Sequence, residues 1–173
     1  MKKRFLILLA ALLFAAGCAN GTAGGTEAVF VDPNAVRGGE YGTLYFEANG
    51  VRFGIYDETE QVLASLPREI ADPYVEKSCA FESEDVIHFF EGFEITANEI
   101  DGTSRITGIR ITSDLVSTPQ GLTIGMREAD AKAAFAALYE AGWNLVDGTA
   151  QLSVVIGDGV VKEIVYGVAP QGN

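Results

Sequence analysis

Apolar and polar residues alternate along several short stretches of the chain, and this pattern predicts β-strands. The alternation is clearest at 93–98, where Phe93, Ile95 and Ala97 are separated by polar residues. Strands are also expected at 86–90 and 106–112, with turns at Glu91-Gly92 and Asp101-Gly102 between them. Together they predict an antiparallel meander with one solvent-facing side.

The stretch Gly50–Leu66 predicts a different unit, a short strand that leads directly into a helix. Asn49-Gly50 is a hairpin signal, and Asp57 with Glu60 has the spacing of a capping box at a helix start. Pro67 cannot continue a helix, so we expect only two to three helical turns. A helix this short needs a sheet to pack against.

The same arrangement returns at Gly121–Leu138, about 71 residues later, with a second helix that ends at Gly142. A second hairpin is expected from 152–156 and 160–166. The predicted fold class is therefore α+β, with two tandem helix-plus-antiparallel-hairpin repeats that form one sheet with the helices on one face. We assign residues 41–168 to this domain and 169–173 to a C-terminal tail.

The N-terminal residues have the composition of a signal peptide. Lys2, Lys3 and Arg4 form a basic start, and 5–16 is apolar and carries no charge. We assign 1–17 to this signal and the Gly-rich stretch 18–40 to a flexible tether. Within the tether, Ala28–Val31 is apolar and is a candidate edge strand.

The sequence Ala15-Ala16-Gly17-Cys18 resembles the lipobox of bacterial lipoproteins, although Ala15 stands where that family prefers leucine. The resemblance implies that Cys18 is the lipid attachment site, carrying palmitate-type acyl chains, and becomes the new N-terminus. It places the chain on the extracytoplasmic side of the cell membrane or outer membrane. The alternative is an ordinary secretory signal with an incidental Cys18.

The chain is strongly acidic, with a formal net charge of −12. Removal of the signal peptide leaves nine Lys and Arg against 24 Asp and Glu, a formal charge of −15. Such a surface repels nucleic acid, which we exclude as a partner. The charge is consistent with simple solubility outside the cell, with a basic partner, or with loosely bound cations.

The residues that carry chemistry do not form a recognisable catalytic or metal-binding pattern. His88 is the single histidine, and no Gly-x-Ser-x-Gly nucleophile motif is present. If Cys18 is lipidated, Cys79 is left without a disulfide partner and is expected to be a small buried residue. We predict no catalytic residues, no metal, no cofactor and no enzyme activity.

Aromatic residues are the candidate binding residues. Phe89 and Phe93 belong either to the core or to an open sheet face where a partner protein binds. Trp143 follows Gly142 and is either a core residue under the second helix or an anchor at the rim of a binding surface.

The pattern of Gly-x-x-x-Gly, capped helix and meander resembles the SmpA/OmlA (BamE-like) family of outer-membrane assembly lipoproteins. The duplication resembles the beta-lactamase inhibitory protein family, and the segments 67–81 and 117–126 are similar to uncharacterised Gram-positive lipoproteins. These resemblances imply a non-catalytic, membrane-anchored module that binds a protein or envelope component. The alternatives are an inhibitor of an extracellular hydrolase and a structural subunit of an envelope assembly complex.

Overall fold

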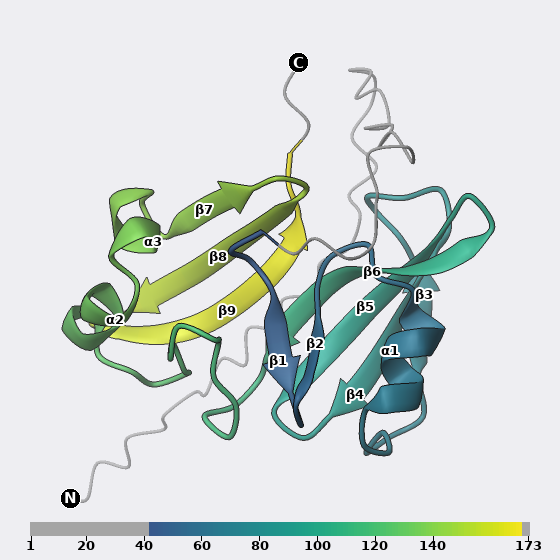
Figure 1. Ribbon diagram of the computed structural model, residues 1–173, viewed down its shortest axis with the longest axis horizontal. Helices are drawn as coiled ribbons and strands as arrows, with labels where there is room; N and C mark the ends of the chain where they lie inside the picture. Colours follow the sequence, from purple (N-terminus) through teal and green to yellow (C-terminus); the bar gives the residue numbers. More distant parts are fainter. Residues whose placement is uncertain (1–41, 171–173) are drawn as a thin grey trace, which may run out of the picture.

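A computed structural model describes residues 42–170, and these residues are folded mainly as antiparallel β-structure (Figure 1). The elements run in the order β1 (Phe46–Ala48), β2 (Val51–Phe53), α1 (Thr59–Ser65), β3 (Tyr74–Lys77), β4 (Glu84–Phe90), β5 (Phe93–Ile100), β6 (Thr103–Ile111), α2 (Glu128–Ala134), α3 (Ala136–Glu140), β7 (Asn144–Asp147), β8 (Ala150–Gly157) and β9 (Val160–Val168). Seven strands form one sheet in the order β3-β4-β5-β6-β9-β8-β7, and β1 pairs only with β2.

Tight turns connect neighbouring strands where the sequence predicts them. Asn49-Gly50, Asp101-Gly102 and Asp158-Gly159 all have positive φ at both residues. This geometry suits a two-residue hairpin loop, because its twist matches that of the flanking strands. The hairpins β1–β2, β5–β6 and β8–β9 follow from it.

The hydrophobic core lies on one side of the seven-stranded sheet. The hairpin β1–β2 and α1 lie over the β4–β6 part, while α2 and α3 lie at the β7–β9 end (Figure 1). Residues from all of these elements join the sheet in a single buried cluster, which includes Phe46, Phe53, Val62, Phe93, Ile95, Ile109, Leu138, Leu152 and Ile164. Burial of these side chains drives the packing of the short helices onto the sheet.

The predicted fold of two helix-plus-hairpin repeats is wrong. Residues 42–170 form one large antiparallel sheet with a separate two-stranded hairpin, and helices take up only three short segments of this range. Four strands follow α1, whereas three follow α3. The prediction gave too much weight to two similar glycine spacings; backbone pairing across β6 and β9 merges the strands of both halves into one sheet.

The helices also depart from expectation. The N-cap residue of α1 is Glu58, which makes no side-chain cap hydrogen bond, while the carboxylate of Asp57 accepts a hydrogen bond from the Gly54 backbone N–H at 2.9 Å. The second predicted helix is interrupted at Phe135, whose φ of −142° and ψ of 77° are not helical. Two short helices therefore replace one long one.

Two strands were not predicted, and both are edges of the large sheet. β3 lies in the stretch between Pro67 and the strand predicted at 86–90, and β7 follows the Trp143 turn. Each contains four residues and, among residues 42–170, pairs on one side only. Their patterns are too short for a periodicity to be recognised, so their pairing depends on the neighbouring strand.

Candidate binding site

The segment 66–73, which we call the link, connects α1 to the edge strand β3 and is fixed to β4. The Ile70 backbone N–H donates to the Phe89 carbonyl at 3.0 Å. Beside it, Glu69 Oε1 lies 3.1 Å from His88 Nδ1. Pro67 at one end and Pro73 at the other lack a backbone donor, which explains why the link is neither helix nor regular strand.

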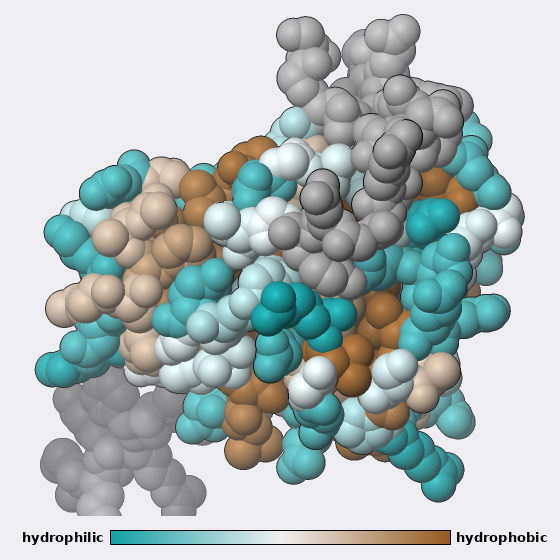
Figure 2. Space-filling model, in the orientation of Figure 1, coloured by the Kyte–Doolittle hydropathy of each residue, from teal (hydrophilic) through white to brown (hydrophobic). Residues whose placement is uncertain are grey.

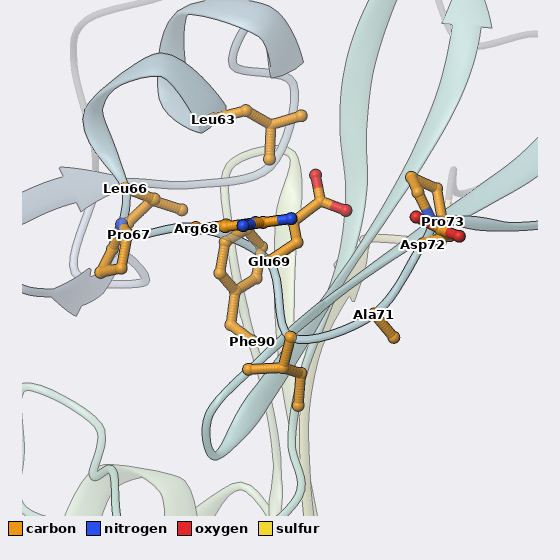
Figure 3. A pocket seen from close by; sticks show the side chains of 10 residues that line it. Leu63, Leu66, Pro67, Arg68, Glu69, Ala71, Asp72, Pro73 and Phe90 are labelled. Carbon is orange, nitrogen blue, oxygen red and sulfur yellow. The ribbon is translucent and has the colours of Figure 1, made fainter.

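Two hollows lie on either side of the link. One, of about 820 Å³, is lined by the end of α1, the link and Phe90 (Figure 3). The other, of about 570 Å³, lies between the link, the β1–β2 turn and 115–117. Both share Pro67, Arg68, Ile70 and Phe90, so they form one continuous surface, which we call the link groove.

The link groove contains the two most exposed large apolar side chains of the described residues. Ile70 is 67% exposed and Leu115 is 66% exposed. Phe90 lies beneath them and belongs to the core, where it stacks on Phe93 at 4.9 Å between ring centroids. The exposed side chains of Ile70 and Leu115, next to the buried ring of Phe90, are suited to burial against a partner.

Charged groups surround these apolar side chains. Figure 3 shows the Glu69 carboxylate between Leu63 and the turn at Asp72 and Pro73. Arg68 lines both hollows, and Glu47 and Glu91 line the smaller one. The most exposed side chains of the groove are therefore apolar, and the charged residues around them are mainly acidic. This arrangement favours a partner segment with basic residues.

The predicted binding residues do not meet in one place. Phe93 lines the smaller hollow from below, but it is 2% exposed and packs in the core against Phe46 and Phe90, so it offers almost no surface to a partner. Phe89 is partly buried and points to the opposite side of the sheet, beside Glu94 on β5. Phe89 contributes to the link groove only through its backbone carbonyl.

Trp143 lies far from the link groove, at the start of β7. It has a φ of 64°, and its ring is partly buried against the core and meets Tyr139 edge to face at 5.5 Å. Its carbonyl accepts a hydrogen bond from the Val154 backbone N–H at 2.9 Å. Trp143 therefore holds α3 against the sheet, in agreement with the core alternative.

The sheet face opposite the core is polar at its centre. Arg110 on β6 lies 3.1 Å from Glu163 on β9 and 4.0 Å from Glu94 on β5. These three residues form a charged row across three strands. Because these charges are already paired with one another, they are less available to a partner. The link groove is therefore the better candidate for a binding site.

His88 and Cys79 each have a partner. His88 is buried and contacts Glu69, so it helps to hold the link against β4. Cys79 is exposed, contrary to the expected burial, and takes part in a disulfide bond. The chain has two cysteines, so an intramolecular disulfide at Cys79 and a lipid on Cys18 exclude each other. Cys18, the signal peptide 1–17 and the tether 18–40 lie outside the described residues.

Ile70 and Leu115 were not among the residues predicted from the sequence. Ile70 is the one large apolar residue between Pro67 and Pro73, and Leu115 lies beside Val116 in the loop before Pro119. Neither belongs to a periodic pattern, so periodicity gives no signal for their exposure.

Comparison of the chain with protein-family models, curated proteins and solved structures gave no match. Among residues 42–170, no three His, Cys, Asp or Glu side chains are arranged to hold a metal ion. The described helices are all too short or too polar to cross a bilayer.

Proposed function

We propose that this protein is a non-catalytic protein-binding module of the cell envelope and that it binds a partner through the link groove. The observation that carries this proposal is the continuous groove around Pro67, Arg68, Ile70 and Phe90, with Ile70 and Leu115 exposed above it. Burial of two such side chains contributes about 1.5–3 kcal/mol each, which is the scale of a binding hot spot.

The shape and charge of the groove favour a protein segment as its occupant. The two hollows both lie along the link and share four lining residues, so a partner segment that follows the link can occupy both. The acidic rim and the net charge of −12 favour basic residues in that segment. We therefore expect a partner segment with an apolar residue next to Lys or Arg.

We further propose that a lipid on Cys18 anchors the protein outside the cytoplasm, and that the acylated chain consequently lacks the intramolecular disulfide at Cys79. The support for this is the charged start, apolar stretch and lipobox-like residues up to Cys18 in the sequence. The test is Cys18→Ser, which should release the protein from the membrane fraction. Mass spectrometry of the mature protein distinguishes an acylated N-terminal cysteine from a Cys79 disulfide, and a non-acylated Cys18 would overturn this part of the proposal.

The groove is tested by capture from native membranes, with cross-linking, using the chain and matched variants. Ile70→Asp and Leu115→Asp should each reduce recovery of the partner at least about tenfold, since each removes buried apolar area and adds charge. Val155→Asp is the control, because Val155 is exposed on the opposite face of the sheet. Equal loss in the control, or turnover of a substrate by the wild-type chain, would contradict the proposal.

A further inference from the structure

The edge strand β7 has an unprotected outer side. Trp143 directs its carbonyl toward β8, and backbone direction alternates along a strand, so Leu145 and Asp147 also face β8 while Asn144 and Val146 face away. Within residues 42–170, the outward N–H and C=O groups of Asn144 and Val146 have no partner. An edge of this kind is a ready template for another strand.

The two edges of the sheet are protected differently. On β3, Glu76 and Lys77 place charges on the edge, and Pro73 precedes it. β7 has the sequence Asn-Leu-Val-Asp, and its only charged residue, Asp147, is engaged by Thr43. Val146 is 52% exposed. Folded proteins commonly cover an apolar edge or charge it, and β7 is not charged along its length.

The chain enters the described region beside this edge. The Asp147 carboxylate accepts hydrogen bonds from the Thr43 backbone N–H at 2.5 Å and from the Thr43 hydroxyl at 2.8 Å. Gly42 lies so close to Asp147 that a Cβ at this position would overlap the carboxylate. The first described residues, Gly42 and Thr43, therefore lie at the end of β7.

We propose that residues Ala28–Val31 of the same chain add to β7 as an eighth strand. The ten residues 32–41 reach about 33–36 Å when extended, whereas a four-residue strand is about 13 Å long. The segment can therefore lie along β7 in either direction. Its sequence, Ala-Val-Phe-Val, is rich in strand-forming residues and has no charge.

The side chains of the segment match the two faces of β7. Alternation puts Val29 and Val31 on one face and Phe30 on the other. On the core side, Tyr139, Trp143 and Leu145 leave apolar surface at this edge, and Figure 2 shows such surface over α3 and β7. On the other side, Val146 is exposed. An added strand covers the apolar surface on the core side and Val146 on the other side.

Amide hydrogen exchange in the full chain tests this inference. The Asn144 and Val146 amides should exchange at least about tenfold more slowly in the wild type than in the double variant Val29→Asp/Phe30→Asp. The control is Ala35→Asp/Val36→Asp, which adds the same charge to the same segment outside the proposed strand. Unchanged protection of the β8–β9 amides in every variant shows that the fold is intact.

Two further measurements separate this occupant from others. Protection of Asn144 and Val146 should be independent of protein concentration, and a synthetic peptide of residues 27–33 should restore it in the double variant. Protection that falls on dilution would assign the edge to a second copy of the chain and overturn the proposal. Equal exchange in the wild type and the double variant would overturn it as well. None of these outcomes depends on the link groove.

Discussion

Thr43 and Asp147, which are 104 residues apart in the chain, are joined by two hydrogen bonds to the same carboxylate oxygen. Gln120 adds a third connection by donating from Nε2 to the Thr43 carbonyl at 3.2 Å. The first described residues are thus tied both to an edge strand and to the loop before α2. This connection fixes the position of Thr43, at the start of the described residues, relative to the sheet.

Replacement of Asp147 should weaken this connection. Asp147→Ala removes the acceptor for both Thr43 groups, and we expect unfolding free energy to fall by about 0.5–1.5 kcal/mol, since the bonds are solvent-exposed. Chemical denaturation measures the change. Asp114→Ala, in the exposed loop after β6, is a control at which a loss as large as that of Asp147→Ala would count against the assignment.

The same connection predicts a dependence on acidic pH. The Thr43 backbone N–H, followed by its hydroxyl, holds the pKa of Asp147 below its ordinary value. A lowered pKa in the folded state means that the ionised carboxylate stabilises the fold above the unfolded pKa of about 3.9. This contribution should be lost as pH falls below about 4 in the wild type, and the loss should be smaller in Asp147→Asn. Identical acid titrations of the two proteins would contradict it.

The Glu69–His88 contact should hold the link in place. Glu69→Ala removes the partner of a buried histidine, and we expect faster amide exchange at Ile70 together with a loss of about 1 kcal/mol in unfolding free energy. The neighbouring Arg68→Ala should leave the Ile70 amide unchanged. In a double-mutant cycle with His88→Gln, a coupling energy near zero would show that the two side chains act independently.

Tyr56 predicts a loss of stability at alkaline pH. Its side chain is buried, its hydroxyl has no hydrogen-bond partner among the described residues, and burial raises its pKa to about 12. Because the folded pKa exceeds the ordinary value of 10.0, this group contributes stability below pH 10 that is lost as pH rises toward 12.

Tyr56→Phe should therefore reduce the alkaline loss without removing it, since burial also raises the pKa of Tyr166. At pH 7 the variant should be as stable as the wild type or more stable, because no hydrogen bond is lost. Thermal unfolding from pH 7 to 11 measures both effects. Tyr74→Phe, on an exposed edge, is the comparison, and an equal effect there would refute the role of burial.

Sequence patterns were sufficient where an element has a strong local signal. The strand β5 was predicted from alternation, and β4, β6, β8 and β9 were predicted from short apolar stretches beside turn residues such as Asp101-Gly102. The edge strands β3 and β7 have no such signal, because four residues show no clear period. The size of the sheet, and with it the fold class, could not be predicted without their pairing partners.

The glycine spacing misled because backbone geometry does not require glycine at every left-handed position. Tyr56 N–H donates to the Ile106 carbonyl at 2.7 Å, and Gly125 N–H donates to the Val161 carbonyl at 2.8 Å. Both residues have positive φ, so Tyr56 and not Gly54 is the structural counterpart of Gly125. The pattern in 93–98 predicts that Phe93 lies on a strand. Its burial depends on the β1–β2 hairpin that packs on it, and no pattern in 93–98 predicts that contact.

Asn98 should be the polar residue on which the β5–β6 pairing depends most. Pairing shifts between Thr96 and Ala97, so that Thr107 is left as an extra residue in a β-bulge. Asn98 is 1% exposed and donates from Nδ2 to the Glu84 carbonyl at 2.9 Å and to Asp85 Oδ1 at 2.6 Å, while its Oδ1 accepts from the Thr107 hydroxyl.

Asn98→Ala leaves these buried groups without their partner, and we expect unfolding free energy to fall by about 2–3 kcal/mol. If the slope of unfolding free energy against denaturant concentration is the same as in the wild type, the variant has lost stability and not compactness. Thr107→Val tests the same bulge from the other strand and should cost less, about 1 kcal/mol, because it removes a single hydroxyl. If Asn98→Ala is no worse than Thr107→Val, the amide does not organise the bulge.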